Sequence, residues 1–364
     1  MKKLTVRKIL VPIDPLLSIE AIQPAKNLAQ RFGASVHLVH AHWFDYPAGF
    51  IALPEPVPGW PITVHQQLEA GLAARLKEIA GTFGLPSENC HQRTGAPAFD
   101  EICQFAHELP ADLIVTSTHG YGGVKHFFLG STAERLVQYA PCPVLVSRKG
   151  RPTIDKILVP VDFSRCSLAG LKYAIQFADQ FAAKLFILNV VYLGEPYTSD
   201  GSAMYDLSAL ERKECQNAEQ QMLRFIRQAS FSRVRFETAI RVGKPVDHIT
   251  AFAKEQGMDL IITATHGWSG FKHVLMGSTA EQVVRRAKCS VLTVPSHAKA
   301  RAEQLSAQRR RTGPVRRIGL PGLALKRKRF EPDQLTRKYR RAELHPFPER
   351  RLTNKFRESH LSSL

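Results

Sequence analysis

The feature that most constrains this chain is a glycine-bearing stretch of 17 residues that occurs twice. The first copy covers residues 118–134 and the second covers residues 265–281, at a constant offset of 147 residues. Both copies open with Thr-His-Gly and close with Gly-Ser-Thr-Ala-Glu. A repeat at this offset predicts that the chain folds as two tandem copies of one unit.

Each copy lies between a predicted strand and a predicted helix. Residues 112–116 and 259–263, which precede the two copies, are short, apolar and rich in β-branched residues, and this favours buried parallel strands. A plain strand-to-helix connection takes roughly 2–6 residues, whereas the first connection extends over residues 117–130. Backbone N–H groups and the helix dipole at a helix N-terminus can hold a phosphate, so the long loop predicts a phosphate site.

The end of each copy also has a purely structural interpretation. Ser131-x-x-Glu134 and Ser278-x-x-Glu281 match capping boxes, in which the Ser accepts a hydrogen bond from the first turn and the Glu reaches back. A Gly-Ser pair before a helix is common and needs no ligand. Phosphate binding and helix capping therefore both remain open from the sequence.

Predicted elements recur in the same order in both halves. Strands alternate with helices, which predicts parallel sheets with helices on both faces. We therefore expect an α/β fold of two tandem doubly wound sheets, with domains at 1–150 and 151–297, and a loop at 43–61. The predicted strands are 8–14, 35–41, 90–93, 112–116, 143–146, 156–162, 185–191, 234–240, 259–263 and 291–294. The predicted helices are 25–32, 66–83, 99–107, 131–139, 168–181 and 207–228, and Gly33 is predicted to cap the first.

The net charge of +18 is concentrated in the last part of the chain. Residues 298–364 hold 19 Lys or Arg against 6 Asp or Glu, with little apolar periodicity. This composition predicts a disordered basic tail. Salt-sensitive contacts to nucleic acid phosphates are one interpretation of the tail, and a solvated tail without a dedicated partner is the other.

The remaining composition is that of an ordinary soluble protein. No apolar run approaches the length of a membrane span or a signal segment, so we expect a cytoplasmic protein without membrane contact. The six cysteines show no metal-ligand spacing, and reduced thiols are expected. Cys142 and Cys289 precede the last strand of each half and are predicted to be small core residues.

Several short motifs together resemble the universal stress protein family in its tandem form. They are Lys-Ile-Leu-Val-Pro-x-Asp at the start of each half, Gly-x-Pro at 95–97 and 243–245, Asp-Leu-Ile before Thr-His-Gly, and Gly-Ser-Thr-Ala-Glu before Cys-Pro/Ser-Val-Leu. The resemblance covers residues 6–148 and 154–295. It implies a five-stranded parallel sheet in each half, ordered 3-2-1-4-5, and an intramolecular pseudo-dimer through the last strands. Further association into a homodimer is left open.

The resemblance also implies an ATP site, with or without Mg²⁺. Nucleotide-binding members of the family hold ATP where the first and fourth strands end, the point at which strand order reverses. Their signature, Gly-x2-Gly-x9-Gly-Ser/Thr, is kept except that Ser117 and Ala264 replace the first glycine, and a positive φ would penalise Ala264. The implied adenine-nucleotide site residues are Asp14, Ala41, Gly120, Gly123, Gly130, Ser131, Thr132, Asp162, Val190, Gly267, Gly270, Gly277, Ser278 and Thr279.

The sequence offers no catalytic residues. Asp14 and Asp162 are implied nucleoside contacts, and a turn or helix N-cap is the structural alternative for both. No Ser-His-Asp or Cys-His pattern accompanies His119 or His266. We therefore expect nucleotide binding in stress response or signalling rather than turnover. A nucleotide-free interaction module, a slow ATPase and nucleic-acid association through the tail are the alternatives.

Overall fold

The computed structural model describes residues 4–16, 18–42, 60–118, 129–148, 153–194, 207–229, 231, 233–265 and 277–295, with residues 60–66 and 207 described by their backbone alone. All of them fall in one compact unit, residues 1–311. The predicted tail lies outside the described residues.

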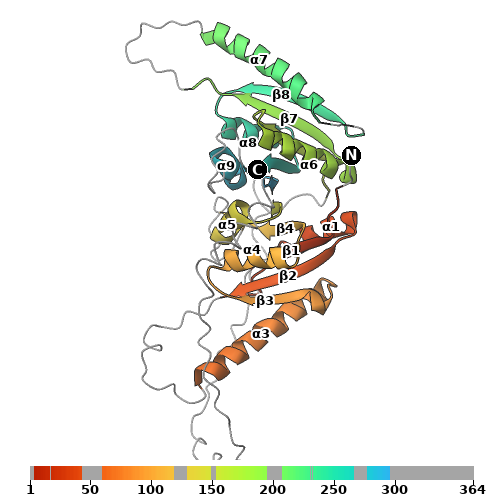
Figure 1. The fold of residues 1–364 in the computed structure, drawn as a ribbon, viewed down its shortest axis with the longest axis vertical. Coiled ribbons are helices and arrows are strands. Elements are labelled where there is room, and N and C mark those ends of the chain that lie inside the picture. The colour runs from red at the N-terminus through yellow and green to blue at the C-terminus, as the bar shows by residue number, and fades with distance from the viewer. Residues whose placement is uncertain are drawn as a thin grey trace, which may run out of the picture. The chain divides into compact units, whose positions relative to one another are not determined.

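Ten strands form one sheet in the order β3-β2-β1-β4-β5-β10-β9-β6-β7-β8 (Figure 1). Each half therefore has the predicted order 3-2-1-4-5. The two predicted sheets are joined because β5 and β10 pair antiparallel, whereas the other neighbours pair parallel. The strands are β1 (Lys8–Pro12), β2 (Ser35–His42), β3 (Cys90–Thr94), β4 (Leu113–Ser117), β5 (Val144–Ser147), β6 (Lys156–Val161), β7 (Lys184–Val191), β8 (Phe236–Val242), β9 (Leu260–Ala264) and β10 (Ser290–Val294).

The helices match the predicted pattern, with earlier starts at four of them. α3 begins at Trp60, inside the stretch predicted as a loop, and α6 begins three residues early because the Ser164 side chain caps it. Gly33 is confirmed as a left-handed C-cap whose N–H donates to the Ala29 carbonyl. The helices are α1 (Ile22–Phe32), α3 (Trp60–Thr82), α4 (Ala98–Glu108), α5 (Ser131–Tyr139), α6 (Arg165–Phe181), α7 (Leu207–Arg227), α8 (Pro245–Glu255) and α9 (Ser278–Arg286), with a 3₁₀ turn at Ser87–Asn89.

The predicted capping boxes are wrong. Gly130 and Gly277 occupy the N-cap positions of α5 and α9, and neither helix has a side-chain cap bond. The Glu134 and Glu281 carboxylates instead contact the Arg285 guanidinium, at 2.6 and 3.1 Å. The Arg285 guanidinium, at the junction of the two halves, therefore pairs with the carboxylates that the capping-box pattern predicted to bind the backbone.

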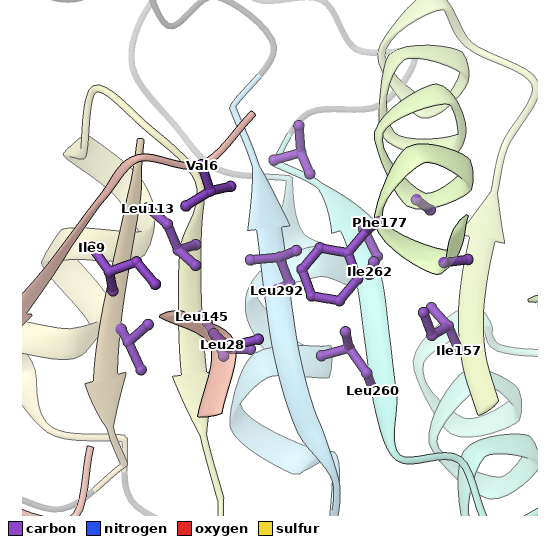
Figure 2. Close-up of a cluster of buried hydrophobic side chains, with 14 of the residues drawn as sticks. Val6, Ile9, Leu28, Leu113, Leu145, Ile157, Phe177, Leu260, Ile262 and Leu292 are labelled. Atoms are coloured by element: carbon purple, nitrogen blue, oxygen red, sulfur yellow. The ribbon is translucent and has the colours of Figure 1, made fainter. Parts of the chain in front are cut away.

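The hydrophobic core continues from one half into the other. Figure 2 shows one buried cluster, in which Leu145 of β5 and Leu292 of β10 lie on neighbouring strands. On the same face, the ring of Phe32 in α1 lies 5.6 Å from Phe177 and 5.8 Å from Phe181 of α6, measured between ring centroids. The two halves therefore bury apolar surface against each other. The predicted burial of Cys142 is confirmed, whereas Cys289 is only partly buried, and all six thiols are free.

Arg148 ties the end of β5 to α9 of the other half. Its Nη2 donates to the carbonyls of Val284 at 2.6 Å and Arg285 at 3.2 Å, and its backbone N–H donates to Ser290 Oγ at 3.1 Å. The last carbonyls of a helix carry partial negative charge and lack intrahelical donors. The guanidinium therefore caps α9 from across the junction.

The first half contains a histidine pair, in which His37 is buried and His91 is partly buried. His37 Nδ1 lies 3.2 Å from His91 Nε2, and His37 Nε2 lies 2.9 Å from Ser35 Oγ. The Ser35 hydroxyl donates to the Arg7 carbonyl, so its oxygen accepts from His37 Nε2–H and His37 Nδ1 accepts from His91. Because burial and the positive charges of His91 and Lys8 oppose protonation, the pKa of His37 is lowered to about 4.

The second half fills the same positions with apolar side chains. The strand registers place Phe186 where the first half has His37, and Ala239 where it has His91. Phe186 packs edge-on against Phe252 of α8, and His91 packs against Phe105, the corresponding residue of α4. The fold therefore does not require the histidines.

This pair predicts acid lability. A histidine in the unfolded chain has a pKa of about 6.5, whereas the pKa of His37 in the folded protein is about 4. Above about pH 6.5 the difference does not affect the stability. As the pH falls from about 6.5 toward about 4, the unfolded chain takes up the proton first, so the free energy of unfolding decreases. We expect the free energy of unfolding to fall by about 1–2 kcal/mol between pH 7 and pH 5 through this pair. Urea denaturation of the full chain at both pH values measures it. The double variant H37F/H91A, which copies the second half, should lose this component, and an unchanged pH dependence would refute the assignment.

Candidate functional site

The candidate sites lie where the first and fourth strands of each half end, at the point where strand order reverses. In the first half, Asp14 follows β1, and its Oδ1 accepts from the Leu16 N–H at 3.0 Å. In the second half, Asp162 Oδ1 accepts from the Ser164 N–H, also at 3.0 Å. The turn role is thus confirmed for both aspartates, and their contact with a nucleoside stays a prediction.

The end of the second strand anchors the segment that follows the first strand. His40 Nδ1 lies 3.1 Å from the Ile13 carbonyl, and because a carbonyl only accepts, this nitrogen carries the proton. Asn189, the corresponding residue of the second half, donates from Nδ2 to the Val161 carbonyl at 2.8 Å. Two different side chains therefore make the same bond in the two halves.

Ala41 and Val190, both predicted site residues, directly follow these anchors. The Ile13 N–H donates to the Val39 carbonyl at 2.9 Å, the last backbone bond between β2 and the segment after β1 among the described residues. Backbone groups of alternate residues point to the same side of a strand, so the N–H and C=O of Ala41 point to the β1 side, beyond that last bond. Ala41 therefore offers a backbone donor and acceptor at the edge of the site.

The base of each long loop is closed by one backbone bond. The Gly130 N–H donates to the Thr118 carbonyl at 3.1 Å, and the Gly277 N–H donates to the Thr265 carbonyl at 2.8 Å. These two glycine N–H groups are therefore already engaged. The remaining predicted loop residues, namely Gly120, Gly123, Gly267 and Gly270, lie outside the described residues.

The first turn of each following helix presents further donors. Glu134 N–H makes the first intrahelical bond of α5, to the Gly130 carbonyl. The N–H groups of Ser131, Thr132 and Ala133 have no acceptor within the described part of the chain. The same holds in α9 for Ser278, Thr279 and Ala280, within the same limits. Three N–H groups at a positive helix end, with two hydroxyls beside them, are the groups that an anion requires.

The two departures from the first motif glycine are accommodated without strain. Neither Ser117 nor Ala264 has a positive φ, so the backbone penalty considered for Ala264 does not arise. Ser117 Oγ lies 2.9 Å from Ser18 Oγ, which links the end of β4 to the segment after β1. In the second half, Gly170 of α6 faces Ala264, and a Cβ added to Gly170 would make ordinary van der Waals contact with the Ala264 Cβ, at 3.5 Å.

The outer rim differs between the halves. His42, at the end of β2, has Nε2 3.6 Å from Glu69 Oε1 and 3.4 Å from Thr94 Oγ1. The strand registers place Val191 and Val242 at the positions of His42 and Thr94 in the second half. Sequence reasoning missed this polar group together with His40 and Asn189, although polar residues inside otherwise buried strands are a signal for them. Among the described residues, no group of three or more His, Cys, Asp or Glu could hold a metal.

Comparison with known proteins agrees with this architecture. The model of the universal stress protein family matches residues 5–148 and 153–295. The chain belongs to the universal stress protein family. It is 33% identical over 153 residues to universal stress protein MJ0531 of Methanocaldococcus jannaschii, an alignment that covers 41% of this chain and 86% of that protein.

Two further relatives extend over more of this stress protein. Universal stress protein Slr1230 of Synechocystis is 28% identical over 233 residues, which cover 63% of this chain and 72% of that protein. The crystal structure of a functionally unknown protein, PA1789 from Pseudomonas aeruginosa PAO1, superposes with a TM-score of 0.57 at 20% identity. That match covers 83% of this chain and 98% of the other, and it supports the fold alone. No helix in the described part of the chain is long and apolar enough to cross a membrane.

The anchoring role of His40 can be tested with the residue that replaces it in the second half. His40→Leu should lower the free energy of unfolding by about 1–3 kcal/mol, because it leaves the Ile13 carbonyl without its donor. His40→Asn should cost less, since Asn189 makes the same bond. Chemical denaturation at pH 7 compares the two. Equal losses for Leu and Asn would contradict the anchoring role.

Proposed function

We propose that this stress protein binds an adenine nucleotide, ATP, in one or both halves and acts in stress response or signalling without turning the nucleotide over. The observation that most supports this proposal is at the first turns of α5 and α9. Each turn has backbone N–H groups that find no acceptor within the described part of the chain. The triphosphate would lie there, at the positive ends of two helices.

The adenosine end would lie toward the second strand of each half. In the first half, the Ala41 backbone presents an N–H and a C=O beyond the last bond to the β1 segment, and this pair matches the donor and acceptor edge of adenine. Asp14 and Asp162 would contact the ribose through their carboxylates, which also shape the turns after β1 and β6. The hydroxyls of Ser131, Thr132, Ser278 and Thr279 would add donors to the phosphates.

The proposal extends to the organisation of the chain. We propose stress protein domains at 1–150 and 151–297 that act as an intramolecular pseudo-dimer, supported by the pairing of β5 with β10. Further association into a homodimer would leave this junction unchanged. We place the protein in the cytoplasm by analogy with the family, and Mg²⁺ would accompany ATP as its usual counterion.

Binding without turnover is the preferred form of the proposal. Catalysis of hydrolysis needs a base placed to activate water, whereas the first-turn carboxylates Glu134 and Glu281 are paired with Arg285. A nucleotide-free interaction module with the same fold is the competing function. The basic residues 298–364 would add weak, salt-sensitive association with nucleic acid.

Proline substitution tests the phosphate site with little risk to the fold. Proline is tolerated at the first position of a helix, and Gly130 and Gly277 already have the extended conformation that precedes proline. Ser131→Pro and Ser278→Pro each remove one N–H and one hydroxyl. We expect the affinity of the altered half for ATP to fall about tenfold or more, because a hydrogen bond to a charged group is lost. Calorimetric titration of the full chain measures it.

The controls separate the backbone donor from the hydroxyl. Ser131→Ala and Ser278→Ala keep the N–H and should retain most of the affinity, and adenosine should bind the proline variants as it binds the unaltered protein. Purified protein should also release adenine nucleotide on denaturation, as measured by mass spectrometry. An unaltered protein that neither carries nor binds ATP would reject the proposal in favour of the interaction module.

A further inference from the structure

We propose that Arg285 is a positioning residue shared by both phosphate sites, because it neutralises one carboxylate beside each of them. The inference rests on the proposed nucleotide function. Arg285 Nη2 lies 2.6 Å from Glu134 Oε1 of α5 and 3.1 Å from Glu281 Oε1 of its own helix, α9. One guanidinium therefore contacts the first-turn carboxylate of both candidate helices.

The arrangement is not duplicated in the two halves. At the repeat offset of 147 residues, the first half has Gln138 where the second half has Arg285. Glu134 consequently has no arginine of its own helix at that position and pairs across the junction instead. The β5–β10 pairing brings α5 and α9 close enough for this contact. The first-half site thus depends on a residue of the second half.

The carboxylates need neutralising because of their place in the helix. Glu134 and Glu281 each follow by three residues the serine that begins the helix. An acidic side chain there normally stabilises the helix by facing its positive end. A phosphate at the same end would meet a second negative charge about one helical turn, 5.4 Å, away, and the two like charges would repel. Arg285 offsets this repulsion at both helices.

The position of Arg285 is fixed by the junction. Arg148 donates to the carbonyls of Val284 and Arg285 and so holds the end of α9 against β5. Leu292 and Thr293 of β10 lie in register with Leu145 and Val144 of β5 on the same junction. The backbone of Arg285, which carries the guanidinium, is therefore held in place by these contacts.

A neighbouring arginine supplies the control. Arg286 pairs instead with Asp247 Oδ1 of α8, at 2.5 Å. The two arginine side chains are similarly exposed, 46% for Arg286 and 39% for Arg285, although Asp247 at 49% is more exposed than Glu134 at 26%. Ion pairs of this exposure contribute little to stability. Arg285→Gln and Arg286→Gln should therefore both fold, and they remove equal charge.

The experiment is calorimetric titration of the full chain with ATP and with adenosine, at low and at high salt. We expect Arg285→Gln to weaken ATP binding about three- to tenfold in both halves at low salt, less at high salt, and to leave adenosine binding unchanged. Arg286→Gln should bind both ligands as the unaltered protein does. The triple variant R285Q/E134Q/E281Q should regain the lost affinity, because it also removes the two negative charges that Arg285 no longer neutralises.

Four outcomes would overturn the inference. They are unchanged ATP affinity in Arg285→Gln, equal losses for ATP and adenosine, a triple variant that stays weak, and an effect confined to the half that contains Arg285. The last would restrict the residue to its own helix. The failure of the proposed function is distinguishable from all four, because in that case the unaltered protein itself would not bind ATP.

Discussion

The antiparallel pairing of β5 with β10 is the interaction on which the rest of this structure depends. Val146, Leu145 and Val144 lie opposite Val291, Leu292 and Thr293, so that each strand covers an edge that the other half would expose. The Thr293 hydroxyl donates to the Val144 carbonyl within this buried seam. Because the pairing is within one chain, it forms at any protein concentration, and a single sheet and a continuous core result.

The same pairing gives the junction its electrostatic character. α5 and α9 follow the loops of their respective halves, and they meet where Arg148 and Arg285 come together. Arg148 satisfies carbonyls at the end of α9, and Arg285 satisfies carboxylates at the beginnings of both helices. The partial negative charge at the end of α9 and the first-turn carboxylates of both helices are thus neutralised at the junction of β5 with β10. Two separate copies of one half could not make this arrangement, since the first half has Gln138 in place of Arg285 and the second half has Pro295 in place of Arg148.

Strands alternating with helices predicted the α/β class, and the resemblance to the universal stress protein family implied the strand order. The sequence also predicted the glycine that ends α1, because a left-handed residue is required there. It failed at several helix starts and at the two capping boxes. Ser131-x-x-Glu134 matches a capping box locally, yet a long-range partner, Arg285, competes for the carboxylate. Likewise, the use of the Gly130 N–H in closing its loop depends on the position of Thr118, which spacing does not specify.

The two halves agree where backbone atoms form the candidate site and differ where side chains form it. In the proposed nucleotide site, the groups that would bind phosphate are backbone N–H groups, which almost any side chain leaves in place, and they are the same at Ser131 and Ser278. The rim of the second strand is built from side chains, and it has diverged from His42 with Glu69 and Thr94 to Val191 and Val242. A polar rim favours polar groups of a ligand and an apolar rim favours apolar groups, so the two rims should differ in the ligand surface that they contact best. The two halves of this stress protein are therefore matched at the phosphate end and unequal at the end where a base would lie.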